Sequence, residues 1–305
     1  MLLSNALFAI EYPFHAFRFS PILSMTISNA TALGRSHGAS LRRLLGSLFT
    51  YRQLIFELTR REIASRYRGS FMGLAWSLIH PLLMLVVYTF VFSYIFESRW
   101  GLANESRVDF AIVLFVGMIV HGFFADCLNR APMLILYNVN YVKKVIFPLE
   151  ILPWVVIGST LFHSLVSVLA LLIVQFFLKG ALPVTAFLFP LLLMPLIFAT
   201  AGIAWILASL GTFVRDVGQS IGIITTILMF LSPVFYPVAR LPERLQFWMQ
   251  LNPLAFMIEE GRKVLVFGTF PDVIPWLFYL VAGFGLAWVG FWWFQMTRDG
   301  FADVL

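Results

Sequence analysis

The chain has 305 residues, of which 60% are hydrophobic and 12% are charged, and its mean hydropathy is +0.89. This composition excludes a soluble protein and predicts an integral membrane protein. The formal net charge of +6 does not indicate nucleic-acid binding, because the basic residues gather beside apolar runs, where they orient membrane spans and meet anionic lipid. The single cysteine, Cys127, excludes an intrachain disulfide.

Residues 1–40 form an N-terminal extension to which the sequence assigns no role. The first part of this extension lacks a basic start, and Glu11 and Pro13 interrupt its apolar runs, so it does not fit a cleaved signal peptide. Met25 offers an alternative start of translation.

Residues 41–70 carry leucine and isoleucine at mostly helical spacing, with arginines on the other faces. The pattern predicts an amphipathic helix that lies along the membrane surface. Gly69 and Ser70 then allow the chain to turn into the bilayer. From the pattern alone this helix is either a contact surface for another protein or a simple membrane anchor.

Residues 71–305 form one predicted transmembrane domain with six spans. An apolar stretch of about 20 residues, roughly 30 Å of helix, is enough to cross a bilayer. The predicted spans are 73–96, 110–124, 151–178, 184–214, 217 to about 235, and 273–297. Basic residues are more numerous beside the span ends that share the side of the termini, which places both termini in the cytoplasm.

The segment of residues 232–262 separates the last two spans and contains Pro233, Pro237, Pro242 and Pro253. Its uncharged run is too short to cross a bilayer. We therefore expect a re-entrant pair of short helices, bent at the prolines, which dips into the outer leaflet and returns. The alternative is an ordinary outer loop with an amphipathic surface helix. The predicted fold class is thus all-α and integral to the membrane.

The loop between the second and third spans exposes Tyr141, Lys143 and Lys144 before the helix breaker Pro148. This loop is long enough for a short helix. It either transmits force from a soluble partner or only supplies positive charge on the cytoplasmic side.

Several kinds of chemistry are missing from the sequence. No G-x-x-x-x-G-K-[ST] phosphate loop is present, and no histidine pairs or Ser-His-acid set indicate a metalloenzyme or a hydrolase, so the chain is not expected to be an enzyme. Ionisable residues are scarce in the spans, which disfavours a proton-coupled carrier. A pathway without fixed charge suits a bulky, largely neutral solute such as a glycan.

Aromatic residues make up 17% of the chain. Rings that line a passage can stack on the apolar faces of sugars, while Tyr and Trp add hydrogen bonds. The ordinary alternative is that such rings face lipid. The candidates for a sugar pathway are Trp205, Phe230, Phe235, Tyr236, Trp248 and Phe256.

Three stretches resemble the transmembrane permeases of ATP-binding-cassette exporters that move lipid-linked surface polysaccharides, especially the O-antigen type. The first begins LTRREIASRYRGSF and includes the first span, the second is NVNYVKKVIFPLEILP, and the third runs from FVRDVGQ through SPVFYPVARLPERLQFWMQLNPLAF to the end of EEGRKVLVFG. They cover most of the region from Leu58 to Gly268, in the order found in the family. Residues 1–40 have no counterpart in it.

The resemblance implies a homodimer of permeases around a central channel in the bacterial cytoplasmic membrane. Two copies of a separate ATPase would bind ATP and Mg, so no cofactor is expected in this chain. The substrate would be a polyprenyl-linked polysaccharide. Alternatives within the same class are a small-molecule or drug exporter and a capsule or teichoic-acid exporter, and a motor-independent channel or scaffold is the alternative outside it.

The resemblance also implies roles for residues. Those implied to contact the ATPase are Arg60, Arg61, Arg66, Tyr67 and Arg68 in the interface helix, and Asn140, Tyr141, Lys143 and Lys144 at or beside the coupling helix. Those implied to shape the gate at the periplasmic mouth are Pro233, Tyr236, Pro237, Asn252 and Pro253. The aromatic candidates Phe230, Phe235, Trp248 and Phe256 belong to the same gate and channel region.

Overall fold

The computed structural model of the chain describes residues 41–95, 107–143 and 147–305. Within these ranges all regular structure is helical and no strand occurs, which confirms the predicted all-α class. The described helices belong to one compact unit, Ala39–Leu305. The predicted N-terminal extension, residues 1–40, lies outside the described residues.

The α-helices of the described ranges follow one another along the chain with short connections. They are α2 (Leu41–Thr50), α3 (Arg52–Arg66), α4 (Trp76–Tyr88), α5 (Arg107–Arg130), α6 (Leu134–Tyr137), α7 (Val139–Lys143), α8 (Leu152–Lys179), α9 (Phe189–Leu192), α10 (Met194–Phe213), α11 (Val217–Leu231), α12 (Glu243–Leu251), α13 (Pro253–Arg262), α14 (Val273–Thr297) and α15 (Phe301–Val304).

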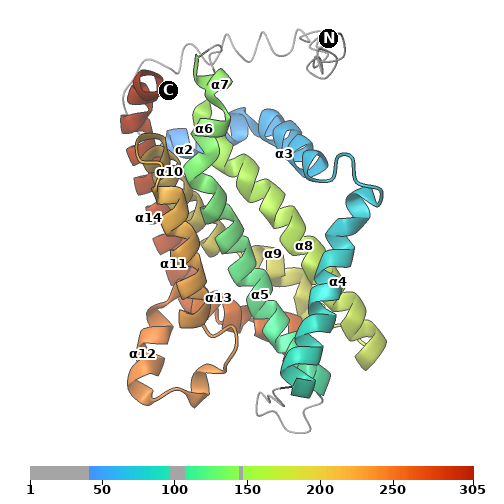
Figure 1. Cartoon of the computed structure of the whole chain (residues 1–305). Coiled ribbons are helices and arrows are strands. Elements are labelled where there is room, and N and C mark those ends of the chain that lie inside the picture. Colours follow the sequence, from blue (N-terminus) through green and yellow to red (C-terminus); the bar gives the residue numbers. More distant parts are fainter. Residues whose placement is uncertain (1–40, 96–106, 144–146) are drawn as a thin grey trace, which may run out of the picture. The chain divides into compact units, whose positions relative to one another are not determined.

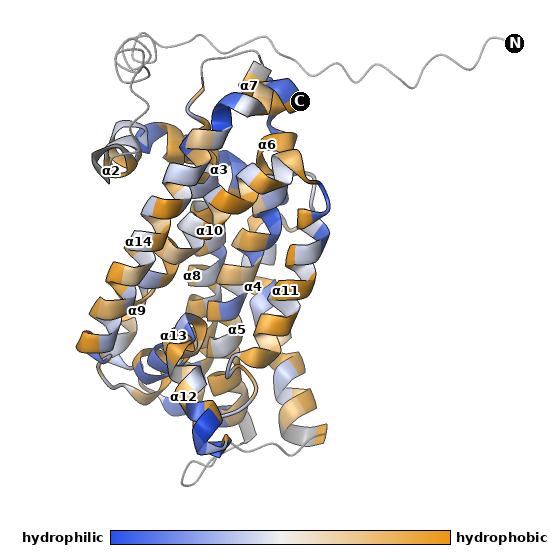
Figure 2. Ribbon diagram, turned by 90° about the vertical axis from the view of Figure 1, so that its left-hand side faces the viewer, coloured by the Kyte–Doolittle hydropathy of each residue, from blue (hydrophilic) through white to orange (hydrophobic). Residues whose placement is uncertain are grey.

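The helices form a bundle with two distinct ends (Figure 1). The helices α3, α6 and α7 and the C-terminus lie at one end, which we call the α3 end, and α12 lies at the opposite end, the α12 end. Hydrophobic residues cover the long helices between these ends, and hydrophilic residues are most frequent at the ends themselves (Figure 2). This distribution is the one expected of a bundle that crosses a membrane.

Five of the described helical segments are long and apolar enough to cross a membrane. They are Gly73–Phe92, Asp109–Tyr137, Leu149–Lys179, Val184–Phe213 and Val273–Val304. The remaining predicted span, 217 to about 235, is shorter than expected, because its helix α11 ends at Leu231. With 15 residues α11 is about 22 Å long, so its crossing of the membrane stays a prediction.

The second span is longer than its uncharged run, 110–124. The helix α5 continues to Arg130, and further helical turns reach Tyr137. Asp126 and Arg130 do not end the helix, because both side chains are paired with residues of other helices. The first half of α5 is enclosed by its neighbours, with Phe110 to Gly117 buried without interruption.

The predicted amphipathic helix 41–70 forms as two helices that meet at Tyr51. Leu44 of α2 is fully buried, and Leu45 and Leu48 pack against the core, as the apolar stripe predicts. The helix α3 has no fully buried residue. The apolar stripe is therefore carried mainly by α2, and polar contacts described below hold α3.

Between α11 and α14 the chain forms two short helices, α12 and α13. Pro242 precedes α12 and Pro253 is the first residue of α13, positions at which the missing N–H leaves no helical hydrogen bond unmade. The side-chain oxygen of Asn252 caps α13 by accepting a hydrogen bond from the N–H of Leu254 at 3.0 Å. One face of α13 packs against α5, whereas most of α12 is exposed.

Glycines bring α10 and α14 into close backbone contact. A Cβ at Gly202 of α10 would overlap the carbonyl oxygen of Leu286 in α14, and a Cβ at Gly290 would overlap that of Gly202. Close approach of backbones through small residues stabilises helix pairs in membranes, where burial of apolar surface alone gives little drive for association.

Replacing Gly202 by alanine should destabilise the bundle, because the added methyl group overlaps the backbone of α14. We expect the free energy of unfolding to fall by about 1–3 kcal/mol, the usual cost of overpacking. Gly285→Ala is the matched control in α14, since a Cβ at Gly285 meets nothing within 4 Å. Thermal unfolding of the purified variants measures both, and equal midpoints would contradict this packing.

Candidate functional site

A group of charged side chains fixes α3 across α5 and α8. Arg130 of α5 donates a hydrogen bond to Glu62 of α3. Asp126 of α5 accepts hydrogen bonds from Arg66 of α3 at 3.4 Å and from Thr160 of α8 at 2.8 Å, and it lies 3.7 Å from Arg130. We call Glu62, Arg66, Asp126, Arg130 and Thr160 the clamp cluster. Acidic and basic side chains alternate in this cluster, so each charged group lies beside a group of the opposite charge and is stabilised by it.

The second half of α3 also lies directly on α8. A Cβ at Gly158 of α8 would lie 2.9 Å from the hydroxyl of Thr59, so glycine permits this approach. Just past the end of α3, the hydroxyl of Tyr67 is hydrogen-bonded to Nδ1 of His163 in α8 at 3.2 Å. The position of α3 is thus determined by contacts with α8 on both sides of the clamp cluster.

The short helix α7, which forms in the predicted coupling loop, contacts α3 as well. Arg61 of α3 donates a hydrogen bond to the hydroxyl of Tyr141 at 3.2 Å. The ring of Tyr141 stacks on Phe147, with 4.3 Å between ring centroids. The predicted interface helix and the predicted coupling segment are therefore joined in the structure.

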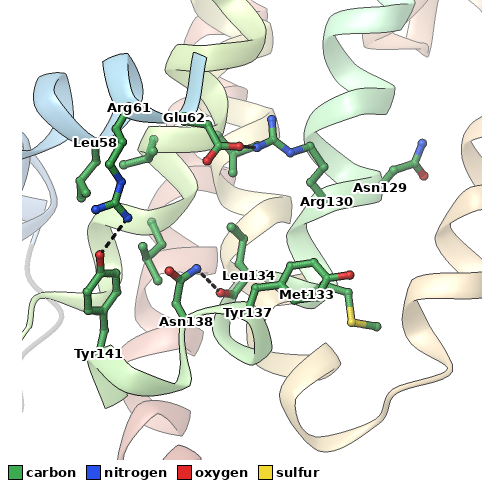
Figure 3. Close-up of a pocket in the computed structure, with 13 residues that line it drawn as sticks. Leu58, Arg61, Glu62, Asn129, Arg130, Met133, Leu134, Tyr137, Asn138 and Tyr141 are labelled. Carbon is green, nitrogen blue, oxygen red and sulfur yellow. Dashed lines mark hydrogen bonds and ion pairs between the residues drawn. The ribbon is translucent and has the colours of Figure 1, made fainter. Parts of the chain in front are cut away.

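A pocket of about 380 Å³ lies between α3, α8 and the segment from α5 to α7 (Figure 3). Figure 3 shows Arg61 and Tyr141 pointing toward each other at one side of the pocket, and Glu62 and Arg130 meeting at another. Within the described ranges no group of three His, Cys, Asp or Glu side chains is placed to hold a metal ion, here or elsewhere.

The residues predicted to contact an ATPase are only partly brought together. Those that take part in the contacts at the α3 end are Arg61, Arg66, Tyr67 and Tyr141. Those that are exposed nearby along the same segments are Arg60, Arg68 and Asn140. The helix α7 ends at Lys143, whose side chain is not described, and Lys144 lies outside the described residues.

Four of the five members of the clamp cluster were not predicted from the sequence. They are Glu62, Asp126, Arg130 and Thr160. Asp126 and Arg130 follow an apolar run, where charges ordinarily mark the edge of the membrane. Their spacing of four residues places both side chains on one face of a helix. This spacing was the sequence signal that could have predicted a charged contact here.

At the α12 end the fully buried Arg262 of α13 binds the backbone of two other segments. Its Nη2 donates to the carbonyl oxygens of Pro233 at 2.7 Å and Val234 at 3.0 Å, and its Nε donates to that of Val113 in α5 at 3.1 Å. Its Nη1 pairs with the carboxylate of Glu259 at 2.8 Å. Arg262 therefore links the chain after α11, the helix α13 and the first half of α5.

The end of α11 at Leu231 explains why Arg262 binds backbone carbonyl groups here. Because α11 ends at Leu231, the following carbonyl groups have no helical partner, and buried carbonyls without a partner are costly. The fixed fork of an arginine can satisfy several of them at once. Burial lowers the pKa of the Arg262 guanidinium to about 10, against the opposing effect of Glu259, so Arg262 stays charged at neutral pH.

Several predicted gate residues form contacts between the end of α11 and the start of α13. Pro233 supplies one of the bound carbonyls, and Asn252, besides capping α13, donates to the hydroxyl of Ser232 at 3.3 Å. The hydroxyl of Tyr236 donates to the carbonyl oxygen of Phe230 at 3.1 Å. Pro237 precedes a single 3₁₀ turn, and Pro253 opens α13.

The aromatic candidates fall into separate groups. Phe235 stacks between Phe230 and Phe92, with ring centroids 5.6 Å and 5.8 Å away. Phe256 of α13 stacks on Tyr279 of α14, with 4.7 Å between the ring centroids. Trp248 of α12 is 65% exposed, whereas Trp205 is fully buried among core side chains. Trp205 is therefore a core residue in this chain, and the sugar pathway predicted for it has no support here.

The role of Arg262 was not predicted from the sequence, because the charged residues 259–263 have the pattern expected at the end of an apolar run. These charged residues have apolar residues on both sides within one helical segment. That position was the sequence signal for a buried charge.

Reversing one charge of the Glu62–Arg130 pair should loosen α3, since Arg130→Glu places like charges side by side. Combining Arg130→Glu with Glu62→Arg should restore part of the lost free energy of unfolding. We expect a coupling energy of about 0.5–3 kcal/mol in a double-mutant cycle. Denaturant unfolding of the four proteins measures it. Additive effects, with no restoration, would show that the pair does not hold α3.

Replacing Arg262 by alanine should remove the donor of the carbonyl oxygens of Pro233 and Val234, which lie outside the helices. It also leaves Glu259 without its partner. The expected loss of stability is about 3–5 kcal/mol. Arg244 of α12 is exposed, so Arg244→Ala is the matched control and should change stability by less than about 0.5 kcal/mol. If the thermal midpoints of the two variants were alike, Arg262 would not be the anchor of this segment.

Two kinds of comparison relate the chain to known proteins, one with a family model and one with individual sequences. A family model described as the ABC-2 type transporter matches residues 53–266, a range that includes the clamp cluster, Arg262 and all of α3 but its first residue. The chain is 27% identical over 264 residues to an O-antigen export system permease protein RfbA of Myxococcus xanthus, covering 86% of this chain and 98% of that protein.

Two further relatives carry related names. An O-antigen export system permease protein RfbA of Klebsiella pneumoniae is 26% identical over 86% of this chain and 97% of its own length. A capsule polysaccharide export inner-membrane protein CtrC of Neisseria meningitidis serogroup A is 26% identical over 77% of this chain and 88% of its own length. Because the family model matches well over half of the chain, this protein belongs to the ABC-2 type transporter family of membrane proteins.

Proposed function

We propose that the chain is the channel-forming permease subunit of an ATP-driven exporter that moves a polyprenyl-linked surface polysaccharide, of the O-antigen class, across the bacterial cytoplasmic membrane. The observation that carries this proposal is the similarity to O-antigen export permeases along nearly their whole length. The sequence contains no phosphate loop of its own, so a separate subunit supplies ATP hydrolysis.

In this proposal two permeases form a homodimer and two ATPase copies bind at the α3 end, which faces the cytoplasm together with both termini. The helix α11 is the sixth crossing, since it connects α10 at the α3 end with the segment that leads to α12 (Figure 1). The pair α12 and α13 is re-entrant. Burial of α13 beside α5 supports this, because broken backbone within a membrane must be covered by protein.

The contacts at the two ends of α5 support a mechanism. Closure of the ATPase subunits on ATP displaces α3 and α7, and the clamp cluster passes this displacement to α5 and α8. At its other end α5 contacts Arg262, which holds the gate segment. ATP can shift the gate only through contacts that differ between the open and closed states.

The aromatic side chains near the gate support passage of a sugar chain. Phe230, Phe235 and Tyr236 lie together around the end of α11, and Trp248 is exposed on α12. Such rings can stack on the apolar faces of sugars without holding a charge in the path.

A second candidate is export of a capsular polysaccharide, which the similarity to the capsule export protein of Neisseria meningitidis favours. Both candidates place a lipid-linked glycan in the channel, and they differ in the chemistry of the exported polymer. A small-molecule exporter of the same class has the same architecture and predicts no glycan phenotype.

The test is deletion of the gene, followed by locating long-chain glycan inside the cell and on its surface. We expect lipid-linked polymer to accumulate inside while the surface is bare, with rescue by the intact gene. Composition analysis of the trapped polymer then separates O-antigen from capsule. Normal surface glycan in a strain without a redundant exporter would contradict the proposal and favour a small-molecule exporter.

A further inference from the structure

Buried polar side chains join the middle of α11 to α5. Nε2 of His121 in α5 lies 3.0 Å from the carbonyl oxygen of Thr225 in α11. The hydroxyl of Thr225 donates to the side-chain oxygen of Asn129, further along α5, at 3.1 Å. His121 is 5% exposed and Thr225 is 3% exposed. We call these three residues the Thr225 contact.

The bond from His121 is additional to the hydrogen bonds of α11 itself. A carbonyl oxygen can only accept, so Nε2 of His121 carries the proton and the ring needs no charge for this bond. Thr225 lies inside α11, where its carbonyl also has a helical partner. The carbonyls that Arg262 binds after α11 have no such partner. Loss of the His121 bond should therefore leave α11 intact as a helix.

Close backbone packing does not fix α11 on α5 in the way that it fixes α10 on α14. A Cβ at Gly202 of α10 would overlap the carbonyl of Leu286. A Cβ at Gly122, next to His121, or at Gly222, one turn before Thr225, would meet nothing within 4 Å. Burial of apolar surface gives little drive for helices to associate in a membrane, so the polar bonds of the Thr225 contact matter for the position of α11.

The Thr225 contact defines one register of α11 on α5. His121 and Asn129 are two turns apart in α5, and both bond to the same residue of α11. A slide of α11 by one helical turn, about 5.4 Å, would break both bonds. Arg262 adds a further connection, since it binds Val234 just after α11 and also Val113 of α5. The chain is thus tied to α5 both at the middle of α11 and after its end.

We propose that His121 is a positioning residue for transport, which holds α11 in one register on α5 through Thr225. A displacement of α5 then carries α11 and the gate residues around its end along with it. The inference rests on the proposed function and adds a residue to its mechanism. An ionisable side chain inside a membrane span is costly and ordinarily serves a function, which fits this role for His121.

The test measures the glycan moved per ATP hydrolysed by the permease and its co-purified ATPase in proteoliposomes. The probe is lipid-linked glycan extracted from the deletion strain. His121→Leu should lower this ratio about three- to tenfold, the population change expected from the loss of one hydrogen bond between membrane helices. His121→Gln keeps an N–H donor and should restore most of the ratio.

A histidine outside the Thr225 contact provides the matched control. His80 of α4 is exposed, so His80→Leu makes the same exchange away from α11. It should change the ratio by less than about twofold.

A second pair of variants tests the other bond and applies even if His121→Leu does not fold. Thr225→Val removes the hydroxyl that donates to Asn129 and keeps the branched shape of the side chain, so the glycan moved per ATP should fall. Thr226 is exposed, and its hydroxyl donates to the carbonyl of Gly222 in the same helix. Thr226→Val is therefore the matched control and should leave the ratio unchanged.

A spin label on Trp248→Cys separates positioning from stability. ATP and Mg should shift the distance between the two permeases in the unaltered background and in His121→Gln. The shift should be lost in His121→Leu at an equal thermal midpoint. An unchanged ratio in His121→Leu and Thr225→Val would overturn the inference, as would glycan movement and ATP hydrolysis that fall together in proportion to folded protein. If the unaltered complex moved no glycan, the proposed function itself would fail.

Discussion

The guanidinium of Arg262 is buried inside an apolar bundle and binds three backbone carbonyls from two segments. A buried cation without partners would cost several kcal/mol, so its neighbours are constrained to keep their positions. Those neighbours are the chain after α11, the helix α13 and α5. The bend that ends α11 at Leu231 is stable because Arg262 satisfies the carbonyls that the bend leaves open. The arrangement of the α12 end therefore depends on this one side chain.

The same helix that receives Arg262 at one end carries two members of the clamp cluster at the other. Val113 lies in the first half of α5, and Asp126 and Arg130 lie at its end. A helix of 24 residues is about 36 Å long, so α5 reaches from one end of the bundle to the other. Both the Arg262 contacts and the clamp cluster thus lie where α5 meets other segments, and buried apolar residues of α5 lie between them.

Apolar runs and prolines predicted most of the fold, because they act locally. Five spans and the short helices α12 and α13 follow from them. The length of α11 did not follow, since the carbonyls after Leu231 are satisfied by a residue about 30 positions later. Nor did the clamp cluster, because Glu62 and Arg130 are separated by 68 residues and only the tertiary fold brings them together. The ATPase contacts expected for Arg61, Arg66, Tyr67 and Tyr141 rest on resemblance and stay a prediction. The structure shows the partners of these side chains within the chain.

In the proposed mechanism, nucleotide bound by the ATPase at the α3 end changes the position of the gate at the α12 end. Spin labels on Trp248→Cys, an exposed position of α12, can report the distance between the two permeases of a reconstituted complex. The chain's own Cys127 is buried, which favours selective labelling. We predict that ATP and Mg shift the distance distribution relative to the nucleotide-free complex. An unchanged distribution in a complex that binds and hydrolyses ATP would contradict the claim.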